Sequence, residues 1–320
     1  MRTVTPTTAE LVQADAFTCD GESRWHTPNA KAEETSFRHR GWAVRREKID
    51  AALVRTHVSY RRIERFRSCG ACAVIEHSAS TNRYRVTAFF CHDRHCLPCA
   101  NAKAAELRRL LVAHMHDRDA RLVTLTLKHR NAPLKDELAR LRKGFQRLRA
   151  TKWWKRLAKG GVVCTEIKRG ADGAWHPHLH ILVEGAFIPV AELKDHWHAA
   201  TGDSYIVDVR RITNDRQAAA YVTKYVTKPI DAKLIEVPED LDEAIKALHH
   251  ARMYEPFGTW RVEIMQCDAN DPGDWQPICT LSEMAAGLKT SQTWAIQLWK
   301  LVSREREEKS RESPGVQCQP

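Results

Sequence analysis

Histidines gather in the segment Trp175-His-Pro-His-Leu-His-Ile-Leu-Val183. Alternate side chains of a β-strand share a face, so His178 and His180 are expected to project together from one strand. A lone histidine is more often a satisfied structural residue, but two imidazoles on one rigid strand can bind a single divalent ion. The pattern therefore predicts a metal site at these two residues.

A third ligand is needed, and two residues are candidates for it. Glu166 is the only carboxylate in the strand expected to precede the histidines, and it is the first candidate. His176 is the second, because it has the right parity but Pro177 disturbs the strand beside it. A mixed set of histidine and glutamate ligands suits Mn²⁺ or Mg²⁺, with water and substrate oxygens completing the shell.

Two tyrosines follow in the helical segment Ala218–Lys228, which Pro229 ends. Tyr221 and Tyr225 are four residues apart and so share one helical face, and Lys224 and Lys228 form a second pair with the same spacing. The alternative is that the tyrosines only pack against the core. A tyrosine hydroxyl can also attack phosphorus, but its pKa of about 10 means that it needs help to lose its proton. A neighbouring metal ion and a lysine would supply that help.

Half of the ten cysteines lie within residues 69–99, where two C-x-x-C pairs are 23 residues apart. Such pairs predict a structural zinc site, since four thiolates leave no open coordination position. The expected zinc ligands are Cys69, Cys72, Cys96 and Cys99. Three neighbours are alternatives for one of these positions: Cys91, His92 and His95. The competing interpretation is that all of these cysteines are ordinary reduced thiols.

The hydrophobic pattern predicts the elements that carry these residues. Alternating residues indicate strands, and apolar residues at steps of three and four after Pro133 indicate an amphipathic helix. The expected strands are 122–127, 162–168, 178–183 and 205–212, and the expected helices are 133–149 and 215–228. The order β-α-β-β-β-α favours an α+β fold, an antiparallel sheet with helices on one face.

The rest of the chain suggests a division into five parts. The expected order is a disordered N-terminus (1–40), a basic helix with the zinc-binding cysteine segment (41–118), a catalytic domain (119–230), a C-terminal extension of helix and strand (231–302) and a disordered tail (303–320). Within the extension, 238–250 is expected to be helical and 260–264 to be a strand.

Charge indicates a polyanionic partner. The chain has 51 Lys and Arg against 40 Asp and Glu, a net charge of +11, and residues 121–169 alone contain 15 basic and 3 acidic residues. The basic helix 133–149 and the segment 152–156 offer contacts to DNA phosphates, and Trp153 or Trp154 could stack on bases if it is not in the core. No run of 18 apolar residues predicts a membrane span and no secretion signal is visible, so a cytoplasmic protein is expected.

At this point the residues resemble a known family. The Cys91–Cys99 segment, the strand Val123-Thr-Leu-Thr-Leu127, the motif His176-Pro-His-Leu-His180 and the helix Tyr221–Pro229 occur in the order found in rolling-circle replication initiators of bacterial plasmids. These initiators belong to the HUH endonuclease superfamily. The resemblance covers roughly residues 60–260.

The resemblance implies a ferredoxin-like or RRM-like catalytic sheet, the HUH fold. His178 and His180 match the metal-binding histidines, and Tyr225 matches the nucleophile. The implied enzyme is a site-specific nickase that joins itself to the 5′ end of origin DNA (single-stranded or in a hairpin) through phosphotyrosine and later rejoins the strands. No Walker-type motif is visible, so a host helicase and DNA polymerase are the expected partners, in the bacterial cytoplasm and associated with the nucleoid or a plasmid.

One position departs from many related plasmid initiators. They have glutamate four residues before the nucleophile, whereas this chain has Tyr221. The arrangement resembles two-tyrosine initiators of small phages, which predicts that Tyr221 performs the second cleavage. Two alternatives stay open: a two-tyrosine HUH single-strand transposase, and a zinc-containing DNA-binding regulator without catalysis.

Overall fold

The protein was described from a computed structural model, which covers residues 35–36, 38–115, 118–128, 130–170, 172–227, 232–261 and 274–311. Most of the segment expected as a disordered N-terminus therefore lies outside the described residues. The chain divides into two compact units. One contains the described residues up to Arg46, Tyr60–His92 and those from Asp274 onward, and the other contains Glu47–Ser59 and the described residues from Asp93 to Arg261.

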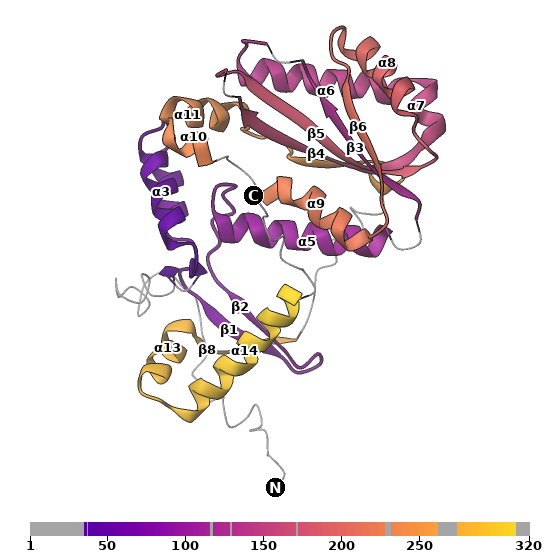
Figure 1. The fold of residues 1–320 in the computed structure, drawn as a ribbon. Helices are drawn as coiled ribbons and strands as arrows, with labels where there is room; N and C mark the ends of the chain where they lie inside the picture. Colours follow the sequence, from indigo (N-terminus) through magenta and orange to yellow (C-terminus); the bar gives the residue numbers. More distant parts are fainter. Residues whose placement is uncertain are drawn as a thin grey trace. The chain divides into compact units, whose positions relative to one another are not determined.

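The larger unit is built on a five-stranded antiparallel sheet with the order β6-β3-β5-β4-β7 (Figure 1). Its strands are β3 (Ala120–Thr126), β4 (Ala158–Arg169), β5 (Trp175–Gly185), β6 (Ile206–Arg211) and β7 (Tyr254–Gly258). The first four, with a helix after β3 and another after β5, have the strand order of a ferredoxin-like fold. The predicted α+β class with antiparallel sheets is confirmed.

Three helices cover one face of this sheet (Figure 1). They are α6 (Leu134–Ala150), α7 (Lys152–Leu157) and α8 (Val190–Thr201). Leu141, Phe145 and Trp154 pack there against Leu179 and Ile181, which alternate along β5 toward this side. These apolar residues form the core on which the helix 133–149 was expected to rest.

The other face is also covered, by helices outside the β-α-β-β-α-β unit. α5 (Leu97–Met115) and α9 (Asp215–Thr227) pack together over it. Leu111 and Val222 meet Leu122 and Leu182 of the sheet in a second core. The expectation that the helices lie on one face is therefore wrong for the predicted helix 215–228, which as α9 covers the opposite face. Helix α5 was not predicted, because its apolar residues show no pronounced single-face pattern.

Helix α8 has clear sequence signals although it was not predicted. It starts after Pro189 and ends at Gly202, whose φ of 86° is the left-handed conformation that glycine adopts readily at a helix end. Leu193 and Trp197, one turn apart, are both fully buried. The element between β5 and β6 is therefore a helix, as a ferredoxin-like connection requires.

The smaller unit contains a three-stranded antiparallel sheet with the order β2-β1-β8 and two helices packed on it. The strands are β1 (Val74–Ser78), β2 (Arg83–Thr87) and β8 (Trp275–Thr280), and the helices are α13 (Leu281–Lys289) and α14 (Thr293–Arg311). Thr280 and Glu283 form a reciprocal capping box at the start of α13. Helix α14 continues past Ser303, into the segment expected to be a disordered tail, while residues 312–320 lie outside the described ones.

Four further helices complete the description: α3 (Ala43–Val54), α4 (Tyr60–Arg67), α10 (Ala232–Glu236) and α11 (Pro238–Ala247). The predicted helix over 238–250 is confirmed as α11. The strand expected at 260–264 is wrong at its start, since Trp260 and Arg261 are helical and β7 ends at Gly258. Across the part of the chain that the structure describes, none of the helices combines the length and the apolar character that crossing a bilayer requires.

Candidate active site

Strand pairing places the two histidines of β5 between polar residues of both neighbouring strands. His178 lies across from Thr126 of β3 and Glu166 of β4, and His180 lies across from Thr124 of β3. Directly paired residues of antiparallel strands share a face, so these side chains form one polar group. This face is the one covered by α5 and α9, because Leu179 and Ile181, which alternate with the histidines along β5, pack toward α6 and α8.

Hydrogen bonds fix the orientation of both imidazoles. The Thr124 hydroxyl lies 3.3 Å from Nδ1 of His180, and the Thr126 hydroxyl lies 3.1 Å from Nδ1 of His178. With Nδ1 engaged on β3, Nε2 of His180 lies 3.0 Å from Oε2 of Glu166. The first-choice third ligand and one predicted histidine are therefore direct neighbours.

Glu166 is held as a carboxylate although it is 5% exposed. Burial alone would raise its pKa, but the hydrogen bond with His180 and the charge of Lys168 outweigh burial, so that the pKa lies below its usual value. The Lys168 Nζ atom is 3.3 Å from Oε2 of Glu166. The site therefore keeps one negative oxygen donor beside an imidazole.

His178 is kept neutral by its surroundings. Burial lowers the pKa of His178 to about 4, and the nearby Glu166 opposes this shift only in part. A neutral imidazole is the form that binds a metal ion. His178, His180 and Glu166 do not, however, bring their donor atoms within 4.8 Å of one another as a set of three.

His176, the second candidate for the third ligand, has a different partner. Its Nε2 atom lies 3.3 Å from Oδ1 of Asp172 in the β4–β5 hairpin. In the β4–β5 register it lies across from Lys168. The hydrogen bond between Glu166 and His180 favours Glu166 as the third ligand.

Helix α9 brings Tyr221 to the same face of the sheet. The Tyr221 ring meets the His180 ring edge-to-face, with centroids 5.8 Å apart and planes at 84°. The Nζ atom of Lys224 lies 3.9 Å from the centre of the Tyr221 ring, a cation–π contact. Tyr225 lies in the last turn of α9, but its side chain is outside the described part of the structure, as is Lys228 altogether.

Sequence reasoning missed three residues of this group: Thr124, Thr126 and Lys168. The signal for the threonines was present, because the alternation Val-Thr-Leu-Thr-Leu places both hydroxyls on one face of β3. Their role depends on the β3–β5 register, which cannot be read from the strand itself.

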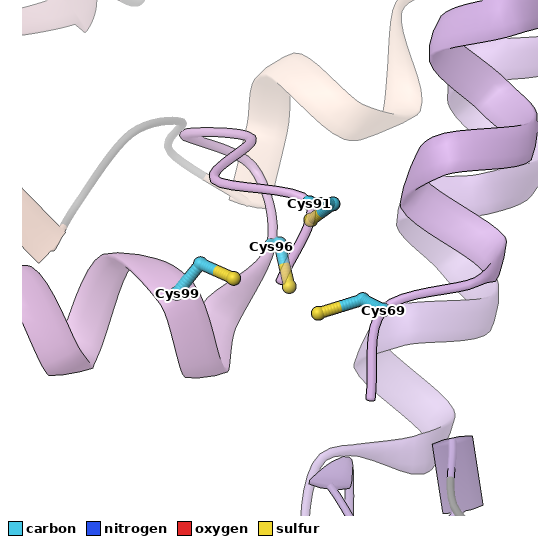
Figure 2. Close-up of side chains that lie close together, drawn as sticks. All are labelled: Cys69, Cys91, Cys96 and Cys99. Atoms are coloured by element: carbon cyan, nitrogen blue, oxygen red, sulfur yellow. The ribbon is translucent and has the colours of Figure 1, made fainter. Parts of the chain in front are cut away.

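Four cysteines come together elsewhere in the chain (Figure 2). The sulfurs of Cys69, Cys91, Cys96 and Cys99 all lie within 4.8 Å of one another, and all four residues are buried. Cys69 follows α4, Cys91 and Cys96 lie between β2 and α5, and Cys99 lies in the first turn of α5. Four soft sulfur donors at this spacing can hold a metal ion such as zinc.

The predicted ligand set needs one correction at Cys72. That residue is exposed and is not among the four, and Cys91 takes its place. Cys72 directly follows Gly70 and Ala71, and its φ of 56° is the left-handed backbone conformation found in turns. Cys91 had been expected only as a substitute, together with His92 and His95.

The two tryptophans of α7 differ in their surroundings. Trp154 is 2% exposed and belongs to the core, so that stacking on a nucleic-acid base is excluded for it. Trp153 stacks on His196 with ring centroids 4.4 Å apart, and its Nε1 donates to Glu192. Core packing, the alternative for these residues, therefore holds for Trp154.

The chain is similar to known replication proteins. A family model described as "Replication protein" (Rep_1) matches residues 83–305. The chain is also similar to a protein named "Protein rep" from Lentilactobacillus hilgardii, at 24% identity over 244 residues, which is 65% of this chain and 77% of that protein. No solved structure matched the chain. Because the family match spans most of the chain, including both the histidine strand and the tyrosine helix, the protein belongs to the replication protein family.

Proposed function

We propose that this replication protein nicks one strand of origin DNA, becomes joined to the 5′ end through a tyrosine, and rejoins the strands in rolling-circle replication. The observation that carries the proposal is the contact between Tyr221 and His180, which joins the tyrosine helix to the histidine strand on one face of the sheet. A nicking enzyme of this kind needs the phenol and the metal ligands on the same side.

Two of the three proposed donors already have the spacing that ligands of one divalent ion need. Ligands that occupy adjacent positions around a six-coordinate ion with bonds of about 2.1 Å are roughly 3 Å apart. Nε2 of His180 and Oε2 of Glu166 are separated by 3.0 Å. We therefore assign a Mn²⁺ or Mg²⁺ site to His178, His180 and Glu166, in which the ion would polarise the phosphate that is attacked.

The chemical step follows from the tyrosine helix. The hydroxyl oxygen of Tyr225 loses its proton and attacks the scissile phosphorus, forming a Tyr–O–P bond. The P–O3′ bond breaks, and the departing oxygen takes up a proton to become the 3′-OH that primes the polymerase. Lys224 and Lys228 are assigned to stabilise the phenolate or the phosphate oxygens.

Tyr221 is assigned as the second nucleophile. After one round of synthesis, its hydroxyl would attack the regenerated origin junction, and the 3′-OH released there would attack the Tyr225 phosphotyrosine and close the circle. Each exchange replaces one phosphodiester by another, so no external energy source is needed. The ring of Tyr221 lies against His180, which supports a role for it near the ion.

The four-cysteine group is proposed to hold a structural Zn²⁺. Four protein thiolates leave no position for substrate, so this ion would stabilise the fold and take no part in strand cleavage. Host helicase and DNA polymerase are proposed as partners, because the chain lacks a Walker motif and supplies only the primer end.

Two other functions remain testable against this proposal. A two-tyrosine transposase would use the same chemistry on the ends of a mobile element, and a DNA-binding regulator would use none of it. Labelled single-stranded DNA from the origin, and separately from the ends, of the plasmid, phage or mobile element that encodes the chain is incubated with the protein and Mn²⁺. Denaturing electrophoresis of the two reactions separates the three functions. We expect a shortened labelled strand and a protein–DNA adduct; a gel shift without either product would support the regulator, and cleavage confined to element ends would support the transposase.

A further inference from the structure

The outward side of α6 and α7 carries a group of unpaired positive charges, which we call the basic face. It consists of Arg142, Lys143, Lys152, Lys155 and Arg156, all exposed. Among the described residues, no carboxylate lies within 4.0 Å of any of the five. Arg140 of α6, in contrast, pairs with Glu137 and Asp203. Cations that are neither buried nor neutralised by neighbours attract a polyanion.

The acidic residues of this segment do not offset that charge. Residues 121–169 contain three of them. Glu137 is buried and bonded to Arg140, and Glu166 is buried in the candidate metal site on the other face of the sheet. Asp136, in the first turn of α6, is the one that is exposed.

The sheet separates the basic face from the candidate active site. Leu141, Phe145 and Trp154 of α6 and α7 pack inward against Leu179 and Ile181 of β5, so the exposed sides of these helices point away from the sheet. His178 and His180 alternate with those residues and project toward α9. A short strand bound at the histidines therefore cannot contact the basic face across this layer.

The surroundings favour phosphate contacts over base stacking. Trp154 is buried, and Trp153 is occupied by His196 and Glu192. A surface that offers cations without free rings suits the regularly spaced phosphates of a duplex, while single strands are held by rings as well as by charge. Phe187, which follows β5 and is 70% exposed, is a nearby ring on which a base of a single strand could stack. Its removal therefore tests whether this surface binds single strands instead of duplex DNA.

We propose that the basic face binds the backbone of double-stranded DNA, as a second DNA contact separate from the strand that is nicked. The proposal rests on the proposed function, because it assumes that the strand to be nicked binds at His178 and His180. It assigns the duplex flanking the nick to α6 and α7.

The test compares a variant in which the five residues of the basic face are changed to Gln with wild type. A matched control changes five exposed basic residues elsewhere to Gln: Arg45, Lys48, Arg61, Arg65 and Lys300. Binding to a 30-base-pair duplex of arbitrary sequence and to oligo-dT is measured by fluorescence anisotropy between 50 and 300 mM NaCl. Each lost phosphate contact reduces the slope of log K against log salt by about 0.9.

We expect the basic-face variant to lose up to about 4 to 5 units of slope on the duplex and less than about twofold in affinity for oligo-dT. The scattered control should retain most of the wild-type slope. Equal weakening on both DNAs, a larger loss on oligo-dT from Phe187→Ala, or an unchanged duplex slope would overturn the proposal. Nicking of single-stranded origin DNA by wild type tests the proposed function separately, since the duplex slope can be read whether or not the protein cleaves.

Discussion

The rings of His180 and Tyr221 meet edge-to-face at 5.8 Å, which connects strand β5 to helix α9 across one side of the sheet. His180 also contacts Glu166 and Thr124, so a single imidazole touches the candidate metal ligand, the orienting hydroxyl and the tyrosine helix. The chemistry proposed for the chain depends on these contacts.

The two tyrosines of α9 are expected to differ in their effects. Tyr225→Phe should abolish both the first nick and the protein–DNA adduct, because the nucleophilic oxygen is removed. Tyr221→Phe should retain the first nick and impair circle closure, because only the second cleavage lacks its nucleophile. Nicking and closure are read on denaturing gels with supercoiled plasmid that carries the element's origin; full circle release by Tyr221→Phe would contradict the division of roles.

Glu166→Gln should weaken the response to the metal ion. The substitution preserves shape but removes the negative oxygen beside His180, so half-maximal nicking should require at least about tenfold more Mn²⁺. The measurement is the initial nicking rate across a Mn²⁺ titration.

Glu184→Gln, on the histidine strand β5, is the matched control. Glu184 accepts hydrogen bonds from Trp260 and Arg118 and has no contact with the histidines in the described structure. Its loss should lower the free energy of unfolding by about 1–3 kcal/mol and leave the Mn²⁺ midpoint unchanged. A shift of the midpoint in both variants would indicate a general loss of stability and contradict the role of Glu166.

The stability of the metal-free protein should fall in mild acid because of His178. Burial lowers the pKa of this imidazole to about 4, below its ordinary value of 6.5. The unfolded chain therefore binds the proton first, so that the contribution of His178 to stability is complete above pH 6.5 and is lost as the pH falls toward 4. His178→Gln should show a smaller decrease in Tm over that interval, measured in EDTA, and identical decreases in both proteins would refute the assignment.

Removal of single cysteines distinguishes the predicted ligand set from the one in the structure. Cys91→Ser should lose the bound zinc, because Cys91 is one of the four buried sulfurs, whereas exposed Cys72→Ser should retain it. Zinc per chain is measured by elemental analysis after gel filtration. Zinc lost from Cys72→Ser and kept in Cys91→Ser would restore the C-x-x-C assignment.

The sequence was sufficient to predict those helices and strands whose hydrophobic pattern is local. The alternation in β3, the histidines of β5 and the apolar steps of α6 all predicted elements that the structure contains. They were predictable because hydrophobic periodicity is determined within a single element. Helix α8 also carries a local pattern, with buried Leu193 and Trp197 one turn apart in a helix that Gly202 ends.

The predictions that failed concern features that depend on distant parts of the chain. Cys72 and Cys91 cannot be ranked as ligands by spacing, because the fold decides which thiol turns inward. The covering of the second sheet face by α5 and α9 likewise depends on packing between segments more than 100 residues apart, of which Arg108 and Thr223 provide one bonded example at 3.3 Å.

The bonds from Thr124 and Thr126 to the two imidazoles limit how this chain can change in length. Deleting one β3 residue ahead of Thr124 would move both hydroxyls to the opposite face of the sheet and break their bonds to His178 and His180 together. Insertions at the ends of the strands leave that pairing intact. Length variation among relatives is therefore expected in the loops around the sheet, while the five-residue stretch from Val123 to Leu127 keeps its length.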